Sequence, residues 1–395
     1  MTTSLVKTTG CILKTVQNLG SFALAGRTMC SFTEAKCFFR SQILLAQNEI
    51  NDLKKNPTST RRFSSGKIKN LQIPRVELKN GVRIPVIGYG TWQAKDDELE
   101  SALDAALEAG YRHIDTAYVY ENEKVIGRVL KKWLSSKKIK REDLFIVTKV
   151  PPSGNYPDGV RKYIKKSLEN LQLDYLDLYL VHVPFQFRDV EGDLHPMTSD
   201  GRIDAVMDTD HIAIWKAMEE QFKNGLTRSI GISNFNVKQI QRILDNSEIK
   251  PSNLQIELHA YMQQNELVDF CKKNNIVVTA YSPLGAPGLG KFLAQFGQTI
   301  EIPDILGNPT VTDLAKKHNK TNAQILLRYT IQKGIVVIPK STNPKRIKEN
   351  FDVFDFQLDD GDMKKMKALD KGNDARILNF SGAFPGIDSH PEFPY

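Results

Sequence analysis

Polar residues that could transfer protons or bind a ligand recur along the sequence, each at the end of a short apolar segment. Asp, Lys and His side chains exchange protons, whereas Ser, Asn, Gln and Tyr side chains hydrogen-bond ligands. In chain order these residues are Asp115, Lys149, His182, Ser233 with Asn234, Gln255 with Glu257, Tyr281 with Ser282, and Lys340 with Ser341. Singly, each could mark the exit of a strand to solvent, and Asp115 with Lys149 could be a plain ion pair. Seven such positions in series indicate one shared site.

The apolar segments predict the elements that must position these residues. Helical patterns separate the segments, as in residues 97–108, where apolar residues recur at helical spacing. The eight segments are 86–89, 111–114, 144–147, 176–181, 229–232, 254–258, 276–280 and 335–338; further helical patterns cover 160–171, 212–222, 237–244 and 266–273. Strands alternating with helices predict parallel βαβ units. Eight units in one stretch favour an α/β fold of the (β/α)8 TIM barrel type, whose active site lies at the carboxyl ends of the strands.

Two additions to the barrel are expected. Residues 76–84 alternate around Asn80-Gly81, a strong hairpin signal. A final helix is expected near 359–369, followed by a C-terminal extension. The barrel with these additions would occupy residues 74–395.

Residues 1–73 differ from the rest of the chain in composition and form a separate leader. They carry eleven Lys and Arg against three acidic residues, which leaves 43 basic and 43 acidic residues for 74–395. The net charge of +8 therefore lies in the leader. Because the body is neutral, it lacks the basic surface expected of a nucleic-acid-binding protein.

The leader has two interpretations, which the sequence leaves open. It is basic and rich in Ser and Thr, which is typical of an organelle transit peptide, and Arg61-Arg62-Phe63-Ser64-Ser65 resembles a mitochondrial matrix-protease site. The alternative is a tail ahead of a cytoplasmic enzyme. No apolar stretch reaches the roughly 18–20 residues that a membrane span needs, so no membrane partner is expected. The body contains one cysteine, Cys271, which is typical of a reducing compartment.

Other catalytic motifs are absent from the sequence. No G-x-G-x-x-G follows a strand, and no Walker-type loop, H-E-x-x-H, paired Cys-x-x-Cys or G-x-S-x-G occurs. The sequence therefore indicates neither a Rossmann nucleotide site nor a metal site.

Four motifs, taken in order, resemble the signatures of the aldo-keto reductases. They are Gly110-Tyr111-Arg112-His113-Ile114-Asp115-Thr116-Ala117-Tyr118-Val119-Tyr120, Leu176-Asp177-Leu178-Tyr179-Leu180-Val181-His182, Gly231-Ile232-Ser233-Asn234-Phe235 and Ile338-Pro339-Lys340-Ser341. The resemblance covers essentially all of 74–395. It implies NADPH-dependent reduction of a small aldehyde or ketone to an alcohol.

The resemblance also implies a catalytic tetrad. Tyr120 would donate a proton to the substrate oxygen, and Lys149 would stabilise the phenolate form of this tyrosine. Asp115 would pair with Lys149, and His182 would orient the carbonyl. Since an ordinary tyrosine has a pKa of about 10, the resemblance implies that Lys149 lowers the pKa of Tyr120.

Cofactor residues carry over from the family in the same way. Tyr281 would stack on the nicotinamide, and Ser233, Asn234 and Gln255 would bind its carboxamide. The remaining residues fall into three groups: Thr91 and Trp92 near the nicotinamide end; Ser282 and Leu284 near the pyrophosphate; and Lys340, Ser341, Asn343 and Arg346 around the 2′-phosphate, with Glu349 and Asn350 toward the adenine. Two cations directed at one phosphate favour NADPH over NADH.

This sequence departs from the aldose-reductase branch in three places. Pro151 and Val183 stand where that branch has pocket tryptophans, and Gly288 and Gln93 replace the ion pair that closes a loop over the cofactor. The tail 376–395 also differs. The substrate therefore stays open.

A non-enzymatic role remains the alternative. Potassium-channel β subunits and some lens crystallins resemble reductases yet act as binding or structural proteins. The stretch 335–350 resembles the monomeric reductases, so we expect a monomeric enzyme.

Overall fold

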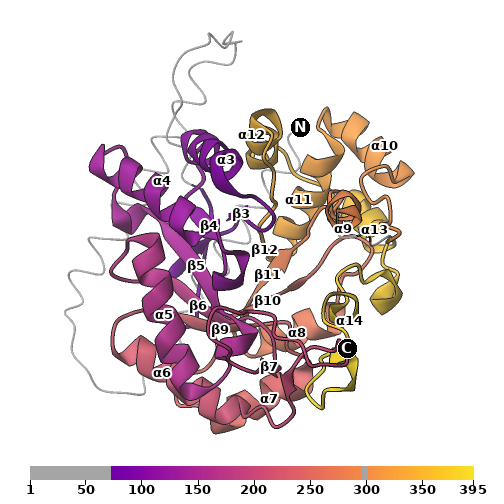
Figure 1. Ribbon diagram of the computed structural model, residues 1–395. Helices are drawn as coiled ribbons and strands as arrows, with labels where there is room; N and C mark the ends of the chain where they lie inside the picture. The colour runs from indigo at the N-terminus through magenta and orange to yellow at the C-terminus, as the bar shows by residue number, and fades with distance from the viewer. Residues whose placement is uncertain (1–72, 296, 298–299) are drawn as a thin grey trace, which may run out of the picture. The chain divides into compact units, whose positions relative to one another are not determined.

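The computed structural model describes residues 73–295, 297 and 300–395, so the leader up to residue 72 lies outside the described residues (Figure 1). Eight parallel strands form one sheet in the order β12-β11-β10-β9-β6-β5-β4-β3. Their bounds are β3 (Tyr89–Gly90), β4 (His113–Asp115), β5 (Phe145–Val150), β6 (Leu178–Val181), β9 (Ile230–Ser233), β10 (Asn253–Glu257), β11 (Val277–Tyr281) and β12 (Val336–Val337). All eight coincide with the predicted apolar segments.

The sheet closes into a barrel. Ile87, just before β3, pairs in parallel with Val337 of β12. Two backbone hydrogen bonds support this pairing, from Gly88 N to Val337 O at 2.8 Å and from Val337 N to Val86 O at 3.0 Å. The predicted (β/α)8 TIM barrel is therefore confirmed.

Helices surround the barrel (Figure 1). They are α3 (Asp96–Ala109), α4 (Glu123–Ser135), α5 (Pro157–Leu171), α6 (His211–Lys223), α7 (Val237–Asn246), α8 (Asn265–Lys273), α9 (Leu289–Ala294), α10 (Pro309–His318), α11 (Asn322–Gln332), α12 (Pro344–Phe351), α13 (Asp360–Lys367) and α14 (Phe380–Ala383). The apolar residues of α3 that recur at helical spacing are all buried: Leu99, Ala102, Leu103, Ala106 and Leu107. Gly110 ends the helix at a φ of 111°.

A hairpin of β1 (Arg75–Glu77) and β2 (Arg83–Pro85) covers the amino end of the barrel, as its Asn-Gly turn predicts. Leu78 and Ile84 from this hairpin pack in one apolar cluster with Phe145 and Val147 of β5 and Leu178 of β6. The interior of the barrel is therefore apolar and filled at this end.

Strand alternation explains why the other end of the interior is polar. In β5, Ile146 and Val150 pack outward against the helices, whereas Phe145 and Val147 face inward. Because side chains alternate along a strand, Lys149 follows them into the barrel. The same argument directs Asp115, Ser233, Gln255 and Tyr281 inward, since their neighbours Ile114, Ile232, Leu254, Ile256 and Ala280 belong to the outer cluster.

The C-terminal segment, residues 384–395, packs beside α14 (Figure 1). Its Phe393 packs in one apolar cluster with Phe187 of β7 (Gln186–Phe187), which pairs with β8 (Ala205–Val206). Glu392 fixes the segment to α7: its Oε1 accepts from Arg242 at 2.6 Å and its Oε2 from Gln239 at 3.0 Å. Burial acts to raise the pKa of Glu392, but these two donors outweigh it and lower the pKa. A carboxylate with a lowered pKa stabilises the fold above its unfolded-state pKa, and this contribution disappears as the pH falls through the folded-state pKa.

Glu392→Gln should release the C-terminal segment at neutral pH, because it removes the charge that Arg242 binds. We expect carboxypeptidase to remove Tyr395 from this variant at least several times faster than from the wild type, as followed by mass spectrometry. Asp388→Asn is the matched control, an exposed acid of the same segment. Equal rates for the wild type and Glu392→Gln would show that Glu392 does not hold the segment.

Candidate functional site

Asp115 and Lys149 form a buried ion pair at the carboxyl ends of β4 and β5. Lys149 Nζ donates to Asp115 Oδ1 at 2.7 Å and to the backbone oxygen of Thr116 at 2.7 Å. Lys149 is 0% exposed and Asp115 is 2% exposed. Burial lowers the pKa of Lys149, and the charge of Asp115 acts against this shift. The ammonium form therefore depends on Asp115.

Tyr120 lies above this pair, at the end of a single 3-10 turn, Tyr118–Tyr120, that follows β4. Lys149 Nζ is 5.2 Å from the centroid of its ring. The ring of His182, which directly follows β6, meets the Tyr120 ring edge to face at 5.7 Å between centroids. The structure thus brings all four residues of the predicted tetrad together, from β4, β5, β6 and the turn.

The surroundings of Tyr120 favour its protonated form. Burial raises the pKa of Tyr120 well above its ordinary value, and the charge of Asp115 raises it further. The hydrogen bonds of the Lys149 ammonium go to Asp115 and Thr116, and its predicted stabilisation of the phenolate form of Tyr120 stays a prediction. Tyr120 remains a protonated phenol at neutral pH.

His182 is neutral at the same pH. Burial lowers its pKa well below the ordinary value, and the charge of Lys149 acts in the same direction. Its Nδ1 is buried and hydrogen-bonds to no described group. A neutral imidazole has one N–H donor and can bind a carbonyl oxygen without adding charge.

The four residues that resemblance assigns to the nicotinamide form a connected group. Ser233 Oγ donates to the backbone oxygen of Gln255 at 2.9 Å, and Asn234 Nδ2 donates to Ser233 Oγ at 3.1 Å. Tyr281 OH donates to Asn234 Oδ1 at 2.7 Å. Asn234 has a φ of 64°, a left-handed conformation that asparagine tolerates. Gln255 has a second partner in the tetrad, since its Nε2 donates to Asp115 Oδ2 at 2.7 Å.

A second group of assigned residues lies after β12 and on α12. Asn343 caps α12 by accepting from the backbone N–H groups of Lys345 and Arg346. Burial lowers the pKa of Lys340, while the charge of Glu98 acts to raise it and the charge of Arg346 to lower it. Among the described residues, neither Lys340 nor Arg346 forms an ion pair within 4 Å. Two neighbouring cations outside any ion pair fit a phosphate monoester at this position.

The remaining assigned residues flank these two groups. Thr91 Oγ1 donates to the backbone oxygen of Asp115 at 2.9 Å, Ser282 has a φ of 50°, and Leu284 packs against the outer core. Ser341 and Asn350 are buried, and Ser341 accepts through its backbone oxygen from Tyr89 OH at 2.8 Å. Glu349 Oε1 lies 3.8 Å from Lys345 Nζ, and the two form an ion pair on the surface of α12.

The loop that lacks the ion pair of the aldose-reductase branch has an aromatic contact. The rings of Trp92 and Phe292 lie 6.0 Å apart between centroids, and Phe292 belongs to α9. Gln93, at a φ of 65°, leaves its buried Nε2 without a partner. Trp92 and Phe292 therefore connect α9 to the end of β3.

Residues near the site that the sequence did not identify include Asn122 and Tyr395. Asn122 Nδ2 donates to the backbone oxygens of Thr91 and Ala94, and its Oδ1 accepts from Thr116 Oγ1 at 2.9 Å. The ring of Tyr395 lies 3.6 Å from the Arg376 guanidinium, and its hydroxyl donates to Asn234 Oδ1 at 3.5 Å. Tyr395 therefore contacts Asn234, one of the residues that the resemblance assigns to the nicotinamide. Asn122 follows the first signature closely, but no local pattern indicates Tyr395.

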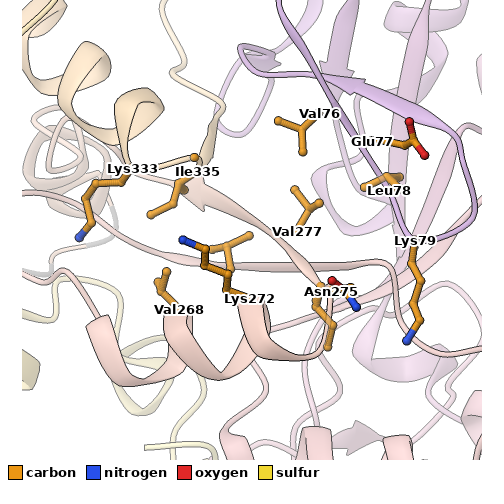
Figure 2. A pocket seen from close by; sticks show the side chains of 13 residues that line it. Val76, Glu77, Leu78, Lys79, Val268, Lys272, Asn275, Val277, Lys333 and Ile335 are labelled. Carbon is orange, nitrogen blue, oxygen red and sulfur yellow. The ribbon is translucent and has the colours of Figure 1, made fainter. Parts of the chain in front are cut away.

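A separate pocket of about 500 Å³ lies at the opposite end of the barrel. Figure 2 shows Val76 and Leu78 of the hairpin region, Val277 of β11, and Lys272 and Lys333 around it. It contains none of the predicted site residues. In the part of the chain that the structure describes, no group of acidic, His and Cys residues could hold a metal ion, and no helix is long and apolar enough to cross a membrane.

Comparison with known proteins agrees with this geometry. The model of the aldo/keto reductase family matches residues 86–371. Aldo-keto reductase family 1 member A1 of Xenopus tropicalis is 41% identical over 323 residues, covering 80% of this chain and 96% of the relative. Dihydrodiol dehydrogenase 3 of Bos taurus is 40% identical over 328 residues, covering 81% and 97%.

Solved structures give the same result. The aldose reductase of Schistosoma japonicum superposes with a TM-score of 0.74 at 41% identity, covering 82% of this chain and 98% of that one. A Bombyx mori aldo-keto reductase in complex with NADP superposes with a TM-score of 0.71 at 37% identity, covering 82% and 100%. With its closed barrel and a family match over most of its length, this chain belongs to the aldo/keto reductase family.

Proposed function

We propose that this chain reduces a small aldehyde or ketone to an alcohol with NADPH, and that Tyr120 donates the proton. NADP-dependent carbonyl reduction is the general activity that membership of the family gives the chain. The observation that supports the finer assignment is the buried Lys149–Asp115 pair beneath the rings of Tyr120 and His182.

The protonation states of the site suit reduction. The nicotinamide, when bound, supplies the hydride. The raised pKa of Tyr120 keeps the proton on its hydroxyl at neutral pH, so the group can donate it. His182, being neutral, donates one N–H to the carbonyl oxygen and holds it beside the Tyr120 hydroxyl. Once Tyr120 gives up its proton, the ammonium of Lys149 is the nearby positive charge that stabilises the phenolate.

The choice of NADPH rests on Lys340 and Arg346. Their mutual repulsion is relieved when an anion binds between them, and the 2′-phosphate is the group that distinguishes NADPH from NADH. Ser341 and Asn343 would add hydrogen-bond donors to the phosphate. Ser233, Asn234 and Gln255 would bind the carboxamide against Tyr281.

Tyr120→Phe should reduce kcat for carbonyl reduction at least a hundredfold, because the proton donor is lost, while the NADPH Kd stays nearly unchanged. Lys149→Met should be similarly inactive. Tyr118→Phe is the matched control, since this tyrosine of the same turn packs against Tyr163 and should keep most of the activity. A Tyr120→Phe enzyme with more than a tenth of wild-type kcat would refute the assignment.

Arg346→Ala should raise the NADPH Kd about tenfold to a hundredfold and leave the NADH Kd nearly unchanged, because a charge-assisted hydrogen bond to the 2′-phosphate is lost. Both constants can be measured by fluorescence quenching. Lys348→Ala is the control, since Lys348 is an exposed cation of the same helix. Equal losses for both cofactors would show that Arg346 does not read the 2′-phosphate.

We also propose that the chain acts as a monomer and that residues 1–63 are a mitochondrial transit peptide, with residues 74–395 forming the enzyme domain. A reporter fused after residue 63 should enter mitochondria, and a longer fusion should be cut near Ser64 or Ser65. An uncut reporter spread through the cytoplasm would favour a tail on a cytoplasmic enzyme.

A further inference from the structure

The carboxylate of Asp115 is held from two sides of the barrel. Lys149 Nζ donates to its Oδ1 and Gln255 Nε2 donates to its Oδ2, each at 2.7 Å. Asp115 belongs to β4 and Gln255 to β10, and β5, β6 and β9 lie between these strands in the sheet. In a closed ring of eight strands this places them on opposite sides. The hydrogen bond therefore crosses the barrel interior, and all three side chains are at most 3% exposed.

Gln255 joins two groups of the site through its side chain, and Asn234 also joins them, because its Nδ2 donates to the backbone oxygen of His182 at 2.9 Å. The backbone oxygen of Gln255 accepts from Ser233 Oγ at 2.9 Å and from Asn234 N at 3.0 Å, which joins Gln255 to the proposed carboxamide group. Its side chain joins the tetrad through Asp115. The second N–H and the carbonyl oxygen of its amide make no hydrogen bond to the described residues. One amide can therefore bind Asp115 and a cofactor carboxamide at the same time.

We propose that Gln255 is a positioning residue for proton transfer: through Asp115 it fixes Lys149 beneath Tyr120, in addition to its contact with the cofactor. This inference rests on the proposed function. It assigns Gln255 a second role, because binding the carboxamide alone would require no contact with Asp115.

The physical reason is that Asp115 is the only carboxylate hydrogen-bonded to Lys149 in the described chain. A buried carboxylate needs donors on both oxygens, and removing one leaves a polar atom without a partner. Without Gln255, Oδ2 would have no donor and the carboxylate could rotate away from Lys149. Lys149 would then keep a fixed bond only to the backbone oxygen of Thr116.

The loss of this donor also has an electrostatic consequence. Burial first, and then the charge of Asp115, raise the pKa of Tyr120. An N–H donor at Oδ2 withdraws part of that charge, so its removal should raise the pKa of Tyr120 further. The other groups facing Tyr120 are Lys149 from β5 and the neutral His182 after β6, and Glu123 of α4 acts on Lys149. None of these three contacts Gln255.

The test compares Gln255→Met with Ser233→Ala, a control in the same carboxamide group that does not touch Asp115. Two quantities are measured in each: the NADP⁺ Kd by fluorescence quenching, without turnover, and the pH dependence of kcat. Both variants should weaken NADP⁺ binding about three- to tenfold. Only Gln255→Met should move the alkaline limb of the pH profile upward, by about half a pH unit or more.

Gln255→Leu is a second variant that also removes the N–H donor. It should move the alkaline limb about as far as Gln255→Met does, and it carries the test if the methionine variant does not fold. In an Asp115→Asn background, Gln255→Met should cause no further shift, because its effect passes through the carboxylate.

An alkaline limb that stays at the wild-type position in both Gln255 variants would overturn the inference. So would an equal shift in Ser233→Ala, or a full shift from Gln255→Met in the Asp115→Asn background. If no aldehyde or ketone of a test panel makes the wild-type protein oxidise NADPH, both the proposed function and this inference are refuted. If the wild-type protein is active but the alkaline limb is unshifted in both Gln255 variants, only the inference is refuted.

Discussion

The site depends on one interaction, the buried pair of Lys149 and Asp115. Moving an ion from water into a protein interior costs several kcal/mol per charge, and the pair is stable only if its hydrogen bonds are nearly complete. Here Lys149 binds Asp115 and Thr116, and Asp115 binds Lys149 and Gln255. These donors and acceptors come from both sides of the barrel. The ion pair therefore requires a closed barrel, and the polar end of the interior is organised around it.

The same burial sets the chemistry of the neighbouring groups. Water that would stabilise a phenolate or an imidazolium is excluded, so Tyr120 keeps its proton and His182 loses its charge. The site therefore contains one fixed cation and one fixed anion beneath two neutral hydrogen-bond donors. Such a site is ready to neutralise negative charge that develops on a substrate oxygen, because its dipoles and charges are already in place.

The sequence predicted the barrel, and it predicted that the proposed site residues lie at the carboxyl ends of its strands, because both depend on local patterns. Lys149 and Gln255 lie among apolar residues near the carboxyl ends of β5 and β10, so they are visible as polar exceptions in the sequence. Contacts between distant residues leave no such pattern. Asp115 and Gln255 are 140 residues apart, and Tyr395 reaches Asn234 from the end of the chain. The effect of burial on the pKa of Tyr120 could not be predicted for the same reason, since burial is a property of the assembled barrel.

The closure of the barrel has a consequence for the order in which the molecule is made. Ile87 is synthesised early and its partner Val337 late, so the ring cannot close until most of the chain has left the ribosome. Contacts between such distant segments form slowly. Until then, apolar side chains that the closed barrel buries are exposed, and the growing polypeptide is open to chaperones.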